Sequence, residues 1–275
     1  MSRQEHRPSP VYAATVRIAA PMGLFVLASV VAARDVAARR RPLFEPTDLE
    51  MEDVGTLEVD VQFGVLRSEG PWRAAVPDIE VDVGLAPGVE IDIDGAYALE
   101  GPDDGSFSFD HAAPDDLWVA AKLGLYDEAD EATDAGWALG AQLGPKLPVA
   151  RDTRGVGYEG LLLVGRHWGS DTHLVLNVGG LVDPGAAVAS GRPVGIEGGV
   201  DLSLALRGTS LSVSGELGGV RFFSADAHQL HATAGIVWAS TSTVDISLIG
   251  LVGFLRGGDR AGVLLGVSPK IALWR

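Results

Sequence analysis

Aliphatic and acidic residues alternate along the chain between residues 57 and 97, and this alternation is the strongest constraint on the fold. Residues 57–65 read LEVDVQFGV, with Leu, Val or Phe at every odd position. Residues 78–85 and 89–97 repeat the pattern. Because successive side chains of a β-strand point to opposite faces, each stretch predicts a strand with one apolar face and one polar face.

The same two-residue period continues to the C-terminus, with Gly, Ala, Ser or Thr on the second face. No sustained helical period interrupts it. We therefore predict twelve strands, near residues 57–65, 78–85, 89–97, 115–126, 137–147, 157–167, 172–181, 192–206, 211–222, 229–239, 243–256 and 261–274.

The length of these stretches separates the possible β architectures. Most hold ten residues or more, whereas strands of globular proteins usually have about five or six. A tilted strand needs roughly 9–11 residues to cross a bilayer, and a sheet in lipid must close so that no edge lacks hydrogen bonds. We predict an all-β fold, a closed antiparallel transmembrane β-barrel of about twelve strands, preceded by a signal-like N-terminal segment. A soluble secreted β-protein is the alternative.

Connection lengths agree with a barrel whose N-terminus is periplasmic, because outer-membrane barrels have short periplasmic turns and longer outer loops. The acidic stretch 127–136 is the exception, since it falls on the turn side and is long. The short connections 86–88, 169–171, 207–209 and 240–242 fit as turns, and 100–114, 148–156 and 182–191 fit as outer loops.

The N-terminal region has a charge and hydropathy pattern of its own. Residues 1–41 hold seven arginines and two acidic residues, and residues 18–33 form an uncharged apolar run. A basic flank before a short apolar run resembles a secretory signal, and the run is shorter than the roughly 20 residues of a spanning helix. We predict a signal-like or anchor segment at 1–41, an acidic linker at 42–55 and the barrel at 56–275, located in the outer membrane of a Gram-negative bacterium. An uncleaved inner-membrane anchor is the alternative for residues 1–41.

Charge and composition exclude several classes of function. The formal net charge is −16 and the chain has no cysteine. Nucleic-acid binding needs clustered Lys and Arg, so no nucleic-acid partner is expected. Without cysteine there is no disulfide framework, thiolate metal site or cysteine nucleophile.

Eight carboxylates share the polar face of the first three predicted strands. If the aliphatic face meets lipid, all eight must face the lumen, because charges in lipid are costly. In the predicted strands 115–126 and 261–274, the alternation also points Lys122 and Lys270 toward the lumen. We predict that these carboxylates, the acidic wall, give the pore a negative potential that favours cations; a wet, ion-paired lumen without selectivity is the alternative. The acidic wall comprises Glu58, Asp60, Asp78, Glu80, Asp82, Glu90, Asp92 and Asp94.

Aromatic residues cluster near the predicted periplasmic strand ends, which is typical of the aromatic girdle at a membrane interface. The predicted girdle comprises Tyr126, Trp137, Trp168, Trp238 and Trp274.

No residue pattern predicts a catalytic, metal or cofactor site. Residues 92–95 (DIDG) match the start of a calcium loop but lack its later ligands. His228 and His231 are three residues apart, which places them on opposite strand faces and disfavours a shared metal. No Gly-x-Ser-x-Gly motif occurs. We expect neither an enzyme nor a bound cofactor or metal.

Three segments carry a family resemblance: the polar loop at 101–110, the strand DLWVAAKLGLY at 116–126 and the segment WALGAQLGPKLP at 137–148. With the preceding hairpin they resemble the outer-membrane barrel family named after the MetA pathway of phenol degradation, over about residues 55–275. The resemblance implies a barrel of about twelve strands and uptake of small organic or aromatic compounds.

Together these patterns predict an outer-membrane channel or transporter for small solutes, porin-like, with an acidic lumen. The expected partners are the lipid bilayer, the outer-membrane assembly machinery and small solutes; the oligomeric state is open. The alternative is a structural or lipid-modifying barrel without transport.

Overall fold

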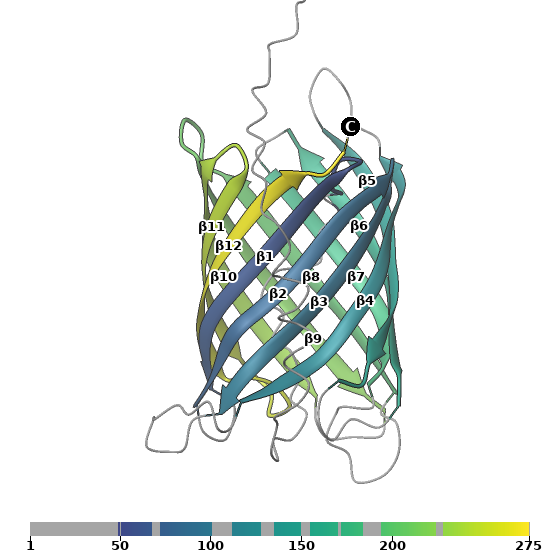
Figure 1. The fold of residues 1–275 in the computed structure, drawn as a ribbon, viewed down its shortest axis with the longest axis vertical. Coiled ribbons are helices and arrows are strands. Elements are labelled where there is room, and N and C mark those ends of the chain that lie inside the picture. Colours follow the sequence, from purple (N-terminus) through teal and green to yellow (C-terminus); the bar gives the residue numbers. More distant parts are fainter. Residues whose placement is uncertain are drawn as a thin grey trace, which may run out of the picture. The chain divides into compact units, whose positions relative to one another are not determined.

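A computed structural model describes residues 49, 51–67, 72–100, 112–127, 135–149, 155–169, 172–183, 194–223 and 228–274. Within these residues, twelve antiparallel strands form one closed barrel, in which each strand pairs with its neighbours in sequence and β1 pairs with β12 (Figure 1). The strands are β1 (Thr56–Arg67), β2 (Trp72–Ala86), β3 (Val89–Glu100), β4 (Ala112–Asp127), β5 (Ala135–Leu147), β6 (Gly157–Trp168), β7 (Thr172–Val182), β8 (Val194–Ala205), β9 (Leu211–Phe222), β10 (Gln229–Thr241), β11 (Val244–Gly253) and β12 (Ala261–Ala272).

The closure of the barrel follows a continuous register between the first and last strands. Thr56 lies opposite Ala272, and Arg67 lies opposite Ala261 at the other end. One residue beyond the ladder, the Leu273 amide donates to the Gly55 carbonyl at 2.7 Å. The predicted all-β, twelve-stranded closed barrel is therefore confirmed.

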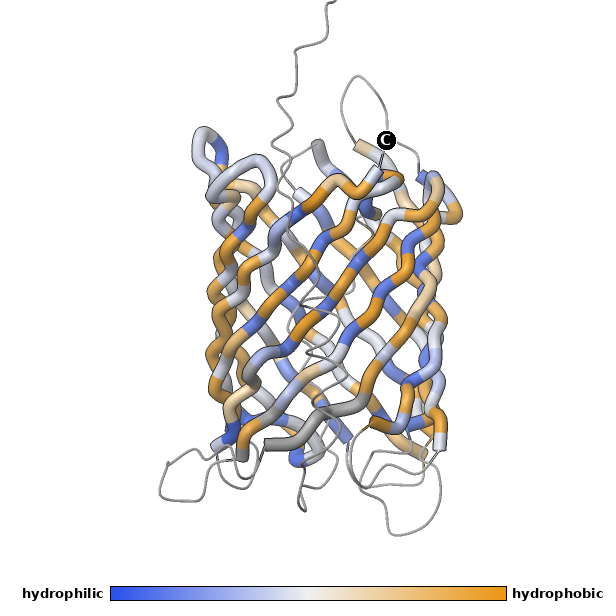
Figure 2. Tube along the Cα trace, viewed as in Figure 1, coloured by the Kyte–Doolittle hydropathy of each residue, from blue (hydrophilic) through white to orange (hydrophobic). Residues whose placement is uncertain are grey.

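Polar and apolar residues alternate along the front strands β1, β2 and β3, as Figure 2 shows. Many large aliphatic side chains are exposed on the outside, whereas acidic side chains on the same strands are buried inside; a smaller set of aliphatic residues, including Leu66, Leu163 and Leu264, is buried. For example, Asp92 is 4% exposed and the adjacent Ile93 is 38% exposed. This is the arrangement of a membrane-spanning β-barrel. Within the described part of the chain, no helix is long and apolar enough to cross a membrane.

Strand β2 begins earlier than predicted, at Trp72 rather than near residue 78. The register of β2 against β3 shifts between Ala75 and Asp78, and Pro77 lies within the shift. A bulge inserts a residue and a proline removes a ladder donor, so the strict alternation is lost there although the strand continues. Strand β4 likewise starts at Ala112, within the predicted loop 100–114, and β11 ends at Gly253 rather than at 256.

Tight turns join strands at the end where the chain enters and leaves the barrel. Gly88, Gly169 and Gly208 have positive φ angles of 69°, 72° and 75° in three of these turns. Glycine adopts this left-handed conformation without a Cβ penalty. The acidic connection between β4 and β5, residues 128–134, and most of the predicted outer loops lie outside the described residues, as does the predicted segment 1–41.

Candidate functional site: the lumenal cavity

A cavity of about 420 Å³ lies inside the barrel. It is lined by seven of the eight acidic-wall residues, all except Asp78, together with Lys122 and Lys270. Asp78 is also buried, at 2% exposure. The structure therefore brings the predicted carboxylates and both lysines to the inside of the barrel.

The two lysines lie at the two sides of the acidic wall. Lys122 Nζ on β4 is 3.3 Å from Glu90 Oε1. Lys270 Nζ on β12 is 3.1 Å from Glu58 Oε2. Both contacts join residues that lie directly opposite each other in neighbouring strands, so the strand register itself brings the ions together.

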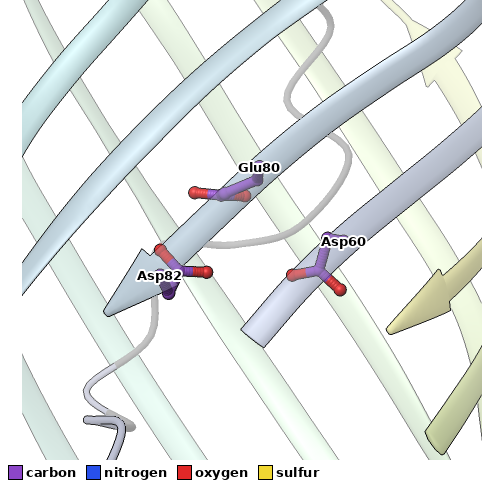
Figure 3. A group of neighbouring side chains, drawn as sticks. All are labelled: Asp60, Glu80 and Asp82. Atoms are coloured by element: carbon purple, nitrogen blue, oxygen red, sulfur yellow. The ribbon is translucent and has the colours of Figure 1, made fainter. Parts of the chain in front are cut away.

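The carboxylates of the wall also lie close to one another. In one set, Asp60, Glu80 and Asp82 each place an oxygen within 4.8 Å of the others; Asp82, Glu90 and Asp92 form a second such set. Figure 3 shows the first set, in which Asp60 comes from β1 and the other two residues from β2. Asp82 belongs to both sets.

A second group of charged residues lines the cavity on strands that the sequence patterns did not single out. Lys146 on β5 is 3.0 Å from Asp183, and both side chains are at most 5% exposed. Trp118 lies against this pair, with Lys146 Nζ 5.2 Å from the ring centroid. The sequence analysis did not single out isolated acidic residues on strand faces that otherwise carry small residues, although their position in the strand alternation already points them inward. Those lining the cavity are Glu159, Glu197, Asp201 and Asp245.

The residues just before β1, Leu49 and Met51–Gly55, contact the inner wall; we call them the lumenal segment. The Glu52 amide donates to Glu90 Oε2 at 2.5 Å, and Lys270 Nζ donates to Glu52 Oε1 at 2.9 Å. Burial raises the pKa of the Glu52 carboxyl, but hydrogen bonds with Glu58 and Lys270 outweigh it and hold the pKa below its usual value.

Glycines on the barrel wall make room for the lumenal segment. A Cβ on Gly84 would collide with the carbonyl oxygens of Glu52 and Asp53. A Cβ on Gly140 of β5 would come within 2.6 Å of Leu49 Cδ2, and one on Gly165 of β6 would collide with Leu49 Cδ1. The segment predicted as part of a linker therefore packs against β2, β5 and β6.

The five predicted girdle aromatics are all exposed, and each lies near the turn-side end of a strand. The opposite end carries aromatics that the sequence analysis did not single out. Exposed there are Trp72, Tyr158, Phe223 and Phe254. Aromatic residues at both ends of the outward apolar surface are typical of the two interfaces of a membrane.

The histidines make separate contacts. His228 Nδ1 accepts from the Phe222 amide at 3.3 Å. His231 Nε2 lies 3.9 Å from Glu216 Oε1. His167 and His173 form a pair, with Nδ1 atoms 3.0 Å apart across β6 and β7.

The fold is similar to that of several solved outer-membrane channels and porins. The COG4313 outer membrane channel from Pseudomonas putida F1 has a TM-score of 0.56 at 14% identity, over 82% of this chain and 99% of that one. The NanC porin has a TM-score of 0.57 at 10% identity, over 78% of this chain and 100% of its own. The KdgM porin has a TM-score of 0.52 at 8% identity, over 77% and 98%. No protein-family model matches the sequence, and no curated protein matches it.

Proposed function

We propose that this chain is a channel for small solutes in the outer membrane of a Gram-negative bacterium, with a lumen that favours cations over anions. The observation that carries the proposal is the cavity of about 420 Å³ inside a closed barrel, lined by most of the acidic wall. The outward apolar surface supports the membrane location, since it would be unstable in water. The three similar barrels are channels or porins by name, which supports the same class of function.

The electrostatic part of the proposal follows from the surroundings of the carboxylates. Charges of one sign in a narrow cavity with low-dielectric walls raise the local concentration of counter-ions. KdgM has been solved in complex with oligogalacturonate, which is a polyanion. The acidic wall of this chain would repel such a substrate, so we propose cations and neutral solutes instead.

The substrate class we propose is small organic compounds, including aromatic ones and organic cations. Trp118 presents an aromatic ring to the cavity beside Asp94, which lies opposite it on β3. Because Lys146 Nζ already lies 5.2 Å from the centroid of this ring, the ring offers apolar contact to aromatic compounds, whereas the carboxylates around the cavity attract organic cations. This agrees with the resemblance to the family named after phenol degradation, which itself stays a prediction.

The test is conduction by the purified full chain. In planar bilayers under a salt gradient we expect a reversal potential of the sign that marks cation preference. Anion preference would contradict the acidic-lumen proposal, and the absence of any conductance would contradict the channel. N-terminal sequencing of the mature protein from outer membranes tests the proposed signal-like segment, since an uncleaved chain would retain residues 1–41.

A barrel without transport is the second candidate, and the contacts of the lumenal segment favour it. Leu49 packs against glycines of β5 and β6 while Glu52 pairs with Lys270 of β12, so this segment occupies space inside the barrel. Liposome swelling with solutes of graded size separates the two candidates, because a closed barrel admits none of them.

A further inference from the structure

The connection between β11 and β12, residues 254–260, is tied to the barrel wall at its base; we call it the strap. It lies at the end of the barrel opposite the tight turns, which the proposed orientation makes the outer mouth. The Gly253 amide donates to the Arg260 carbonyl at 3.0 Å, and the Arg260 amide donates to the Arg67 carbonyl of β1 at 2.6 Å. These backbone hydrogen bonds fix where the strap leaves and rejoins the wall.

An ion pair joins the strap to the inner face of β2. Arg73 Nη2 is 2.5 Å from Asp259 Oδ2 and Arg73 Nε is 3.3 Å from Oδ1, so the guanidinium binds the carboxylate through two nitrogens. Arg73 lies opposite Leu66, which has the same parity along β1 as the inward Asp60, and directly opposed residues share a face. The side chains of Arg73 and Asp259 are only 3% and 7% exposed. This pair, which we call the latch, therefore lies inside the barrel.

The strap is held from a second side by β10. Gln229 Nε2 donates to the Gly257 carbonyl at 2.7 Å, and the Gly257 amide donates to the His228 carbonyl at 3.0 Å. Gln229 also lines the lumenal cavity. Because β11, β12 and β1 lie between β10 and β2 in the closed barrel, the strap spans the inner side of the mouth across these strands.

The wall beside the latch is apolar and dry. Leu66, directly opposite Arg73, belongs to a cluster of inward residues on β1, β2, β11 and β12 that are at most 4% exposed. Charges next to such a surface are weakly screened by water, so their attraction is strong. Removing one member leaves the other charge buried and unpaired, which is costly. The position of the strap should therefore depend on the latch. The cluster comprises Leu66, Ala75, Ile249 and Leu264.

We infer that the strap covers part of the outer mouth of the lumen and that the latch holds it there, so that release of Arg73 from Asp259 opens the path to the cavity. The strap's use as a gate for solutes rests on the proposed channel function. Its position as a cover does not.

A cross-link tests where the strap lies. A Cβ on Gly258 would be 3.6 Å from Gln229 Cβ, and Gly258 has no left-handed φ, so two cysteines at these positions meet the geometry of a disulfide. The chain has no cysteine of its own. We expect Gln229→Cys, Gly258→Cys to form the disulfide in the full chain in detergent, shown by the mass added on alkylation with and without reduction. Gln229→Cys with Ser240→Cys, near the two ends of β10, is the control and should not cross-link. Absence of the first disulfide would refute the position of the strap.

Access to the cavity tests the latch. Ser247 lines the cavity and is 4% exposed, so Ser247→Cys reports on an uncharged, water-soluble maleimide added outside cells that display the protein. Adding Asp259→Asn should speed labelling at least about tenfold, because it breaks a buried ion pair. Arg260→Gln changes an exposed residue of the same strap and should leave the rate unchanged. The reversed pair Arg73→Asp, Asp259→Arg should return the rate close to that of Ser247→Cys alone.

Equal labelling rates with and without Asp259→Asn would overturn the inference, as would a reversed pair that labels as fast as Asp259→Asn. If Asp259→Asn does not fold, which heat-modifiable gel migration would reveal, Arg73→Gln should give the same acceleration. Conductance is measured separately in bilayers. A conducting barrel whose labelling ignores the latch refutes this inference alone, whereas latch-dependent labelling without conductance in any variant refutes only the proposed function.

Discussion

Lys270 Nζ on the last strand lies 2.9 Å from Glu52 Oε1, in the segment that precedes the first strand. The same ammonium is 3.1 Å from Glu58 Oε2 on β1. One lysine thus joins the lumenal segment to the strand pair that closes the barrel. Glu52 also contacts β3 through its amide, so the lumenal segment is held on both sides of β1.

Replacing Lys270 by Met should destabilise the barrel and loosen the lumenal segment. The substitution leaves two carboxylates facing each other without the ammonium, and a hydrogen bond to a charged group contributes about 1.5–3 kcal/mol. We expect a loss toward the low end of that range, because the Lys270 side chain is 29% exposed. Denaturant unfolding in lipid measures it. Lys270→Arg keeps the charge and should retain most of the stability.

The Lys270–Glu52 contact also predicts a pH dependence. The folded-state pKa of Glu52 is below its ordinary value of 4.5, so its contribution to stability is present above that value and is lost as pH falls through the lower folded-state pKa. Wild type should exceed Glu52→Gln in unfolding free energy near pH 7, and the difference should shrink at about pH 3. A difference that stays constant over this range would contradict the ion pair.

Gly165→Ala should displace Leu49 from the wall. The added methyl would collide with Leu49 Cδ1, whereas its next contacts, at 3.7 Å, are ordinary. If the lumenal segment narrows the pore, single-channel conductance should rise in Gly165→Ala and in Leu49→Ala. The double variant should conduct no more than Leu49→Ala alone, because the two changes act on one contact. Gly180→Ala is the control, since its Cβ meets nothing closer than 3.4 Å. A similar rise in conductance in Gly180→Ala would contradict a specific effect of the contact with Leu49.

Lys146 and Asp183 form a buried ion pair that should respond asymmetrically to mutation. Lys146→Met leaves the Asp183 carboxylate buried at 4% side-chain exposure, and breaking a buried pair on one side costs about 3–5 kcal/mol. Adding Asp183→Asn should recover most of the loss, because no uncompensated charge remains. Unfolding of the single and double variants by denaturant measures this, and a double variant as unstable as Lys146→Met would contradict it.

Cation preference should depend on the lumenal carboxylates and not on acids elsewhere. The double variant Asp60→Asn, Asp94→Asn removes two charges that line the cavity and should shift the reversal potential toward zero. Asp127→Asn, at the exposed end of β4 and outside the cavity lining, should leave it unchanged. The preference should also weaken at high salt, because mobile ions screen the fixed charges. Equal shifts in both variants would point to a surface effect.

The sequence by itself determined the strands and their faces. In β1, Phe63 and Val65 point outward and Asp60 and Gln62 inward, as the alternation predicts, because parity along a strand is a local property that no distant contact can alter. The alternation failed where a bulge broke it, as at Pro77 of β2. The absence of a helical period and the length of the strands were enough to predict a closed barrel.

Only the tertiary structure decided which inward residues meet. That Asp82 lies opposite both Glu58 and Asp92 depends on the turns and bulges that set the register of β1, β2 and β3, and a shift of one residue would turn every side chain to the other face. The contact of Lys146 with Asp183 and of Leu49 with Gly165 joins residues far apart in sequence. The first contact arises from the registers of the β5–β6 and β6–β7 pairs and the second from the path of the lumenal segment, neither of which has a local signal.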